Sequence, residues 1–355
     1  RTAVAANPGS VALRVALGDH LAAAGAPDQA IAEYEAALAL EPGHLPAYLS
    51  LSQALLANGQ PGEAEAVVRK ALELYPGSVE AQAALAAVQS GTGQGSEAAN
   101  TLLQAWTSNP GAWETALALG QTLIDLGDLE AAEQIISTVT TVRPGEPAGW
   151  LALGNLWMEG RGPAWAMTAY RRGLQESPGD ASLLLALGQV ESDLGLLDQA
   201  EETLRRAASL HRHLAGPEVA LGDLLLQRLD FEGAEECYRR AQSAAPADPS
   251  GWLRMGQLRL RQGQPEEAVT AFEQALAVQT HSVDAHVALG GAYRHMGEMD
   301  KAMAAYQSAV MADPTSAAGR LAMVRALTDS GAYDEAEAAV NRLLQDFPGD
   351  ESVLL

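Results

Sequence analysis

The sequence predicts an all-α solenoid of about ten stacked helix pairs, on three observations. The first is a period of 34 residues that runs from 11 to 350 without insertion or deletion. The second is the regular placement of helix-breaking residues: counted from Val11, position 15 of the period is Gly in eight blocks and position 32 is Pro in eight. The third is a composition with 48% hydrophobic but only 5% aromatic residues, which is typical of Ala- and Leu-rich helices. A strict repeat of this length indicates structural units that stack on one another.

Small and apolar residues mark the inside of each block. Position 20 is Ala in all ten blocks, position 7 is Leu in eight and Met in two, and position 8 is Gly in seven. Apolar residues recur at helical spacing between positions 1 and 14, so we expect a first helix there, which the Gly at position 15 ends. A second amphipathic helix follows, and the Pro at position 32 separates it from the next block. Short side chains at positions 8, 20 and 27 are expected where the two helices approach most closely.

This pattern resembles that of the tetratricopeptide repeat, which has large or aromatic residues at positions 4, 11 and 24 and small ones at 8, 20 and 27. Trp150 and Trp252 supply position 4. The aromatic residues at position 24 are Tyr34, Tyr170, Tyr238, Phe272 and Tyr306. The resemblance covers residues 11–350. It implies a right-handed superhelical α-solenoid whose first helices line a concave face.

The period also predicts where the repeats begin and end. Residues 1–10 are expected to be the tail of a preceding, truncated repeat, and residues 351–355 the start of a further one. Between them we expect a single array of ten repeats: 11–44, 45–78, 79–112, 113–146, 147–180, 181–214, 215–248, 249–282, 283–316 and 317–350. Since both ends cut through the period, we expect a fragment of a longer protein. The Gly- and Ala-rich blocks favour a bacterial source.

Composition and motifs argue against several classes of function. The chain has 22 Lys and Arg against 45 Asp and Glu, so nucleic acid is a disfavoured partner. No apolar run approaches 18 residues, and we expect no membrane insertion. The Gly91–Gly95 run lacks the strand and spacing of a phosphate loop, while His211 and His213 lack further metal ligands. Cys237 at position 23 is expected to be a small buried residue rather than a nucleophile. The sequence predicts no enzyme, metal or cofactor.

The resemblance places positions 2, 5, 6, 9, 12 and 13 of each first helix on the concave groove. Position 5 is apolar in nearly every block, and its predicted groove residues include Leu117, Leu151, Leu185 and Leu253. Position 9 carries an amide or an acid in most blocks, and the predicted row is Gln53, Gln121, Asn155, Gln189, Asp223 and Gln257. Side-chain amides both donate and accept, so this row suits the backbone of an extended peptide. The alternative is a groove that holds only water.

The groove charges change sign along the chain. Position 13 is small in the first three blocks and then forms a predicted acidic stripe of Asp125, Glu159 and Asp193. Further along, the predicted basic patch consists of Arg254, Arg261, Arg294 and Arg325. Guanidinium forks suit a carboxylate or a phosphate. The alternative is that these arginines pair with Asp and Glu nearby. Arg259 falls at position 11, where neighbouring side chains are expected to cover its stem.

These features favour a non-catalytic protein–protein interaction scaffold. We expect it to bind an extended peptide or partner segment in the concave groove, basic near the acidic stripe and acidic near the arginines. The family's two-carboxylate clamp needs Lys at position 5, which is apolar here, so an adaptor for chaperone tails is disfavoured. Two alternatives stay open. One is the substrate-recognition arm of a larger glycosyltransferase or sulfotransferase, and the other is a self-assembling structural scaffold with uncapped array ends.

Overall fold

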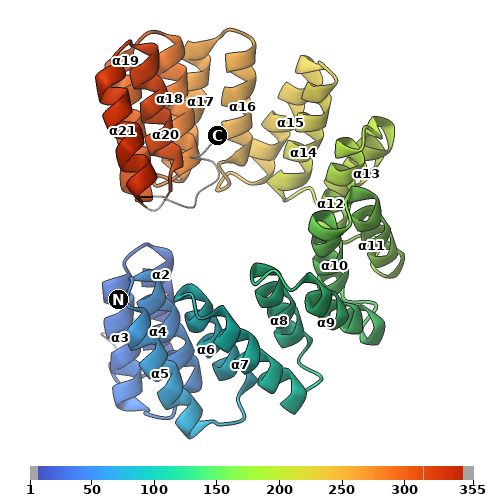
Figure 1. Ribbon diagram of the computed structural model, residues 1–355, viewed down its shortest axis with the longest axis vertical. Helices are drawn as coiled ribbons and strands as arrows, with labels where there is room; N and C mark the ends of the chain where they lie inside the picture. The colour runs from blue at the N-terminus through green and yellow to red at the C-terminus, as the bar shows by residue number, and fades with distance from the viewer. Residues whose placement is uncertain (1–6, 315, 347–355) are drawn as a thin grey trace. The chain divides into compact units, whose positions relative to one another are not determined.

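The computed structural model describes residues 7–314 and 316–346, and every regular element within them is an α-helix (Figure 1). The helices follow one another in ten pairs: α2 (Val11–Ala23) and α3 (Pro27–Leu40), α4 (Leu45–Ala57) and α5 (Pro61–Leu74), α6 (Val79–Gly91) and α7 (Gly95–Ser108), α8 (Trp113–Asp125) and α9 (Leu129–Val142), α10 (Pro147–Gly160) and α11 (Pro163–Glu176), α12 (Ala181–Asp193) and α13 (Leu197–Leu210), α14 (Ala215–Gln227) and α15 (Phe231–Ala244), α16 (Ser250–Arg261) and α17 (Pro265–Val278), α18 (Val283–His295) and α19 (Met299–Ala312), α20 (Ala318–Asp329) and α21 (Tyr333–Asp346). The prediction of an all-α solenoid of paired helices is confirmed. Of the expected flanking pieces, residues 1–6 and 351–355 lie outside the described residues.

The turn inside each pair is closed by a residue with positive φ. In eight pairs this residue is the glycine at position 15, with φ between 72° and 80°. In the second pair, for example, the N–H of Gly59 donates to the carbonyl of Leu56 at 3.0 Å, and that of Gln60 to Leu55 at 2.8 Å. Glycine adopts this conformation without the steric penalty of a Cβ atom. The regular glycine therefore fixes the antiparallel return of each second helix.

Two pairs lack glycine at position 15, and in these a different residue has the positive φ of the turn. In the fifth pair Arg161 keeps a φ of −127°, and the following Gly162 takes a φ of 90° instead. In the seventh pair Leu229 itself adopts a φ of 62°, the one non-glycine residue with positive φ in the described chain. A left-handed conformation costs an ordinary L-residue about 1–2 kcal/mol. The turn after α14 is therefore strained.

The helices of a pair pack closely because glycine at position 8 faces a large residue at position 24. A Cβ atom on Gly154 would lie 2.0 Å from Cε1 of Tyr170, and one on Gly290 would lie 2.3 Å from Cε1 of Tyr306. The Ala at position 20 is equally confined, and Ala166 is 0% exposed. These contacts set the distance between the first and second helix, and they explain why the period keeps its small residues.

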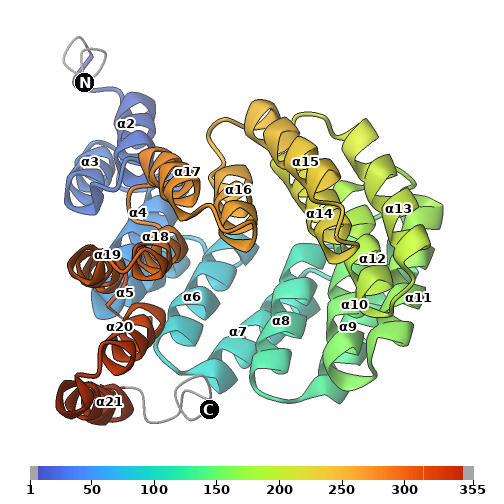
Figure 2. The ribbon, with the colours of Figure 1, turned by 90° about the horizontal axis from the view of Figure 1, so that it is seen from above.

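The helix pairs form two compact units, residues 1–177 and 178–355, which we call unit 1 and unit 2. In unit 1 the first helices contact one another in the order α2, α4, α6, α8 and α10, and in unit 2 in the order α12, α14, α16, α18 and α20. Among the described residues, the second helices form no comparable row of mutual contacts. Figures 1 and 2 accordingly show the first helices of each unit as one layer and the second helices as another. The residues predicted to face the groove lie on the layer of first helices.

Candidate functional site

The short side chains at position 9 are held by tyrosines from the helix core. Asn155 Oδ1 accepts a hydrogen bond from the hydroxyl of Tyr170 at 2.7 Å, and Asp223 Oδ1 accepts one from Tyr238 at 2.8 Å. Tyr34 donates in the same way to Asp19 at 2.8 Å. Each tyrosine is at position 24 of the second helix, so its ring packs on glycine 8 while its hydroxyl reaches the groove row. The groove side chains in these repeats are thus oriented from inside the solenoid.

These tyrosines stay protonated donors at neutral pH. Burial raises the pKa of Tyr170 to about 12. The pKa of Tyr238 is also raised, first by burial and then by the negative charge of Asp223. Burial and Asp19 together raise the pKa of Tyr34. One oxygen of each position-9 partner therefore accepts a hydrogen bond from a core hydroxyl at neutral pH.

In the second, fourth, sixth and eighth repeats position 24 is not tyrosine and position 9 is glutamine, and three of these four glutamines bond along their own helix. Gln121 Nε2 donates to Asp125 at 3.0 Å, and Gln189 Nε2 donates to Asp193 at 2.9 Å. Gln257 instead accepts a hydrogen bond from Arg254 at 2.9 Å. The remaining residue of the predicted row, Gln53, is exposed on α4. The sequence carried a signal for this difference, because tyrosine at position 24 occurs with Asp or Asn at position 9 in the first, fifth and seventh repeats. The sequence analysis missed it.

The predicted acidic stripe is exposed, but its members belong to different units. Asp125 and Glu159 lie at the ends of α8 and α10 in unit 1, and Asp193 ends α12 in unit 2. Two of the three carboxylates accept hydrogen bonds from a glutamine one turn earlier, as described above. Glu159 has no hydrogen bond or ion pair within the described part of the chain. The exposed carboxylates keep oxygen atoms available to a cationic ligand.

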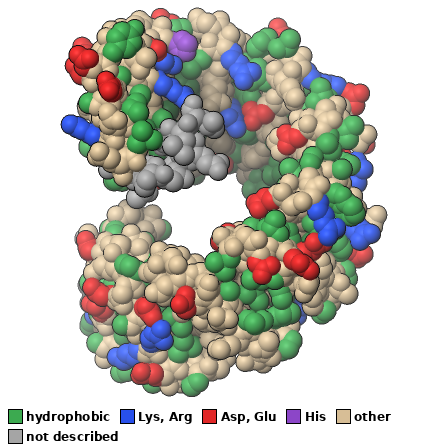
Figure 3. All heavy atoms as spheres, viewed as in Figure 1, with side chains coloured by type: hydrophobic (Ala, Val, Ile, Leu, Met, Phe, Trp, Pro, Cys, Tyr) green, Lys and Arg blue, Asp and Glu red, His purple; other side chains and the backbone are tan. Residues whose placement is uncertain are grey.

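All four arginines of the predicted basic patch lie in unit 2, and they differ in their partners. Arg254 Nε lies 3.1 Å from Asp223 Oδ2, and Arg294 forms an ion pair with Asp329. Arg261 and Arg325 are exposed and form no ion pair with any residue that the structure describes. On the face that Figure 3 presents, Lys and Arg side chains of unit 2 lie close to Asp and Glu side chains. The patch is therefore a mixed-charge surface with two arginines open to a ligand.

A groove runs over the first helices of unit 2 at this patch. One depression, of about 550 Å³, is lined by Asp223 and Gln227 on α14 and by Arg254, Gln257 and Arg261 on α16. A second, of about 500 Å³, shares Arg254 and Gln257 and continues to α18. Because the two depressions share lining residues, they form one continuous surface across three neighbouring repeats. An extended chain could lie along it.

The carboxyl of Asp223 in this groove has a shifted pKa. Burial raises the pKa of its carboxyl, and this effect exceeds the lowering by the Tyr238 hydrogen bond and by the charges of Arg254 and Arg261. The carboxylate therefore sits partly desolvated between a core hydroxyl and a guanidinium. Its ion pair with Arg254 takes the place that a carboxylate of a ligand would otherwise have beside this arginine.

The predicted apolar groove residues are only partly covered. Leu117, Leu151, Leu185 and Leu253 are all of intermediate burial. Leu117 and Leu185 pack at the margin of hydrophobic core clusters. Their remaining surface lies between the polar positions of the first helices, where it can contact apolar parts of a bound segment.

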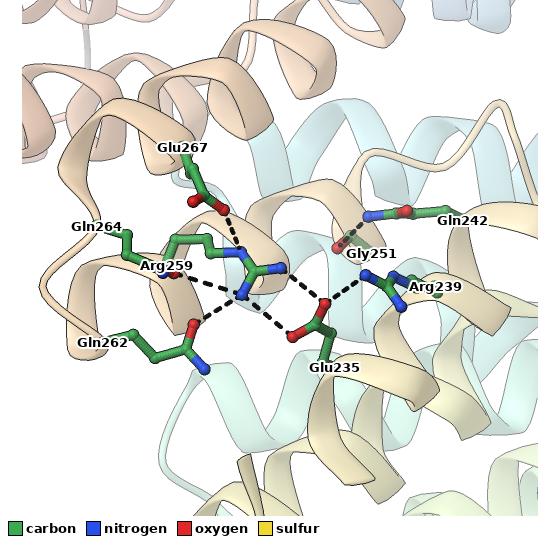
Figure 4. A network of polar contacts seen from close by, with 8 residues as sticks. All are labelled: Glu235, Arg239, Gln242, Gly251, Arg259, Gln262, Gln264 and Glu267. Carbon is green, nitrogen blue, oxygen red and sulfur yellow. Dashed lines mark hydrogen bonds and ion pairs between the residues drawn. The ribbon is translucent and has the colours of Figure 1, made fainter. Parts of the chain in front are cut away.

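Arg259 has a structural role of the kind that its position predicted. Its side chain is 16% exposed, and its guanidinium contacts Glu235 at 2.7 Å and Glu267 at 3.1 Å. Nη1 also donates to Gln262 at 2.8 Å (Figure 4). The network joins α15, α16 and α17, so this arginine links two consecutive repeats and is not available to a ligand. Of the three arginines on α16, two face the groove depression and one holds the stack together.

The described residues offer little to catalytic or metal chemistry. Cys237 is 1% exposed, and burial raises the pKa of its thiol to about 11. The rings of His211 and His213 lie 6.3 Å apart, and no group of three or more metal-ligating side chains exists in the described part of the chain. No helix there is both long and apolar enough to cross a bilayer.

Comparisons with known proteins agree with the repeat pattern. Two family models, both described as tetratricopeptide repeat, match the chain, one at residues 185–249 and 253–317, the other at 21–88, 55–111, 91–156 and 294–354. No curated protein matches the sequence. Similar solved structures include the crystal structure of the APC/C hetero-tetramer Cut9-Hcn1, with 13% identity and a TM-score of 0.48 over 95% of this chain and 93% of that one. The crystal structure of MamA protein is 22% identical, with a TM-score of 0.38 over 48% of this chain and 93% of that one.

Proposed function

The chain belongs to the tetratricopeptide repeat family, whose members are generally non-catalytic protein–protein interaction scaffolds, and from this premise we propose that its first helices bind an extended segment of a partner protein. The observation that carries the proposal is the fixed orientation of the position-9 side chains. Tyr170 occupies the oxygen of Asn155, so the exposed amide nitrogen remains free to donate. An extended segment offers a backbone carbonyl to such a donor at every second residue on one side.

The charges of the groove define the partner's composition. Arg261 and Arg325 have no carboxylate partner among the described residues, so an acidic side chain of the segment is favoured beside them. Asp125 and Glu159 are exposed carboxylates, and basic side chains are favoured near these. The proposed ligand is therefore a segment with a basic stretch and an acidic stretch, held through its backbone by the amide row.

Binding of peptides with opposite charge order tests this proposal. We expect the full chain to bind a peptide whose basic half precedes or follows its acidic half in only one of the two orders. Arg261→Gln should weaken binding of that peptide by about tenfold, since one charge-assisted contact is lost. The matched control is Arg69→Gln, which removes an exposed arginine on the second helix α5, outside the groove. Equal binding of both charge orders, or equal loss in both variants, would contradict the proposal.

A further inference from the structure

A separate depression of unit 2 lies among α13, α14 and α15 and shares no residue with the groove. It has a volume of about 600 Å³ and contains three arginines, Arg205, Arg212 and Arg240, against one carboxylate, Glu218. Leu221 of α14 also lines it. The chain as a whole carries a net charge of −23. Three of the 22 Lys and Arg residues of this acidic chain therefore gather around one depression.

Arg212 enters this depression through a departure from the repeat pattern. It stands at position 32, which is proline in eight of the ten repeats. Its Nε donates to the carbonyl of Ser209 at 3.3 Å. Within the described part of the chain no carboxylate pairs with it, so both terminal nitrogens can bind a ligand. The turn between repeats needs no arginine here, since proline serves in most of the others.

The other two arginines are oriented by carboxylates of limited exposure. Arg240 Nε lies 3.0 Å from Glu218, whose side chain is 14% exposed. Its Nη1 lies 3.4 Å from the exposed Glu236, and its Nη2 donates to Cys237 Sγ at 3.0 Å. Arg205 lies 2.6 Å from Glu201, whose side chain is 16% exposed. Glu201 is shared, because its second oxygen pairs with Arg228. Such partners hold the guanidinium groups in place without satisfying all five donors of each.

The chain contains its own comparison for this depression. Three repeats further along, an equivalent depression of about 490 Å³ lies among α19, α20 and α21. There Gln307 replaces Arg205, Met311 replaces Ser209, and Pro314 stands at the position of Arg212. Arg342 keeps the position of Arg240, and Arg320 stands at that of Glu218. The hollow is thus a product of the repeat geometry, and what distinguishes the first depression is the pair Arg205 and Arg212 of the sixth repeat.

We propose that the depression of Arg205, Arg212 and Arg240 binds a phosphate monoester, carried by a partner protein as phosphoserine or phosphothreonine. Three guanidinium forks from separate segments match a group with three terminal oxygens and a charge near −2. A carboxylate has only two oxygens and one charge. Nucleic acids and anionic membranes present extended negative surfaces, which the remaining acidic surface of the chain repels. A single phosphate on a polypeptide avoids that repulsion.

Calorimetric titration of the full chain tests this assignment with three ligands: a short phosphoserine peptide, the same peptide with aspartate in place of phosphoserine, and inorganic phosphate. We expect the phosphopeptide to bind and the aspartate peptide to bind at least about tenfold more weakly. Arg212→Pro, which restores the usual repeat residue, and Arg205→Gln should each weaken phosphopeptide binding by about tenfold. Circular dichroism checks that both variants keep their helices.

The matched control is Arg69→Gln. Arg69 occupies the same repeat position as Arg205, also pairs with a glutamate one turn earlier, and is 58% exposed against 65%. Its binding should equal that of the unmodified chain. Inorganic phosphate that binds as tightly as the phosphopeptide, with the same loss in the Arg212 variant, would identify a free oxyanion as the ligand and overturn the partner-protein part of the proposal. No binding of any ligand, or equal binding by all variants, would overturn it entirely.

Discussion

The hydroxyl of Tyr238 lies 2.8 Å from Oδ1 of Asp223, and the other oxygen of this carboxylate lies 3.1 Å from Nε of Arg254. Tyr238 is 0% exposed and belongs to the core of the seventh repeat, whereas Arg254 belongs to the eighth and lines the groove. A core side chain of one repeat therefore positions a groove arginine of the next. Changes in the core are expected to alter the binding surface through this relay.

Removing the hydroxyl of Tyr238, which bonds a carboxylate, should destabilise the chain more than removing the hydroxyl of Tyr170, which bonds a neutral amide. Tyr238→Phe leaves the ring in place, and Phe272 shows that phenylalanine fits position 24. It deletes a hydrogen bond to a carboxylate, for which we expect a loss of about 2 kcal/mol in the free energy of unfolding. Tyr170→Phe deletes a hydrogen bond to the neutral Asn155, and about 1 kcal/mol is expected. Urea unfolding of the two variants measures both values, and an equal loss would count against the charged relay.

The raised pKa of Asp223 gives the chain a specific pH dependence. Burial makes the folded state bind this proton more tightly than the unfolded state does. The contribution of Asp223 to stability is therefore fully present below its unfolded pKa of about 4 and is lost as the pH rises through the higher folded pKa. Asp223→Asn does not titrate, so its free energy of unfolding relative to the unmodified chain should increase from pH 3 to neutral pH, as urea unfolding at each pH will measure.

Direct titration of Asp223 by NMR supplies the control. Arg254→Gln and Tyr238→Phe each remove a group that lowers the pKa of this carboxyl, so both should raise that pKa further. A lower pKa in either variant would show that the group removed does not lower the pKa of Asp223. A relative stability of Asp223→Asn that falls with rising pH would contradict the same assignment.

The sequence predicted the fold well because the repeat places the same few constraints in each block. Glycine 8, glycine 15 and alanine 20 act locally, and their consequences follow from steric size and backbone conformation alone. The ion pairs were harder to predict. Arg254 meets Asp223 from the preceding repeat, so their contact depends on how two helix pairs stack and on the rotamers of long side chains. The role of Arg259 was easier to predict than that of Arg254 and Arg261, because position 11 is where a side chain is covered by its neighbours.

Two adjacent glycines of α18 should respond in opposite directions to alanine. A Cβ atom on Gly290 would lie 2.3 Å from Cε1 of Tyr306, so Gly290→Ala must push the helices apart. We expect a loss of about 2–3 kcal/mol, as for other overpacked cores. A Cβ atom on Gly291 would have nothing within 4 Å, so Gly291→Ala should add up to about 1 kcal/mol of helix stability. Hydrogen exchange of the α18 amides measures both effects. Similar shifts for the two variants would refute the close-contact argument.

The Arg259 network should show energetic coupling between repeats. Glu235 and Arg259 are 19% and 16% exposed and lie 2.7 Å apart, on α15 and α16. Loss of either partner removes one counter-charge from a largely buried group and leaves it only its more exposed partner, Glu267 or Arg239, so the single variants Glu235→Gln and Arg259→Gln should each destabilise the chain. A double-mutant cycle is expected to give a coupling energy of about 1–2 kcal/mol. The pair of Arg239 and Glu235, with Arg239 61% exposed, serves as the control and should couple by less than about 0.5 kcal/mol.

Leu229 offers a simple route to a more stable chain. It adopts a φ of 62° at position 15, where eight other repeats place glycine, and its side chain is 72% exposed. Leu229→Gly removes the left-handed strain of 1–2 kcal/mol but increases the backbone entropy of the unfolded chain, so we expect a net gain of about 0.5–1 kcal/mol. Leu229→Ala keeps the Cβ atom and the strain, and its stability should be unchanged. The reverse change, Gly263→Leu at a φ of 74°, should cost about 1 kcal/mol. Differential scanning calorimetry of the three variants decides the matter, since a gain in Leu229→Ala equal to that in Leu229→Gly would assign the effect to the exposed side chain instead of the backbone.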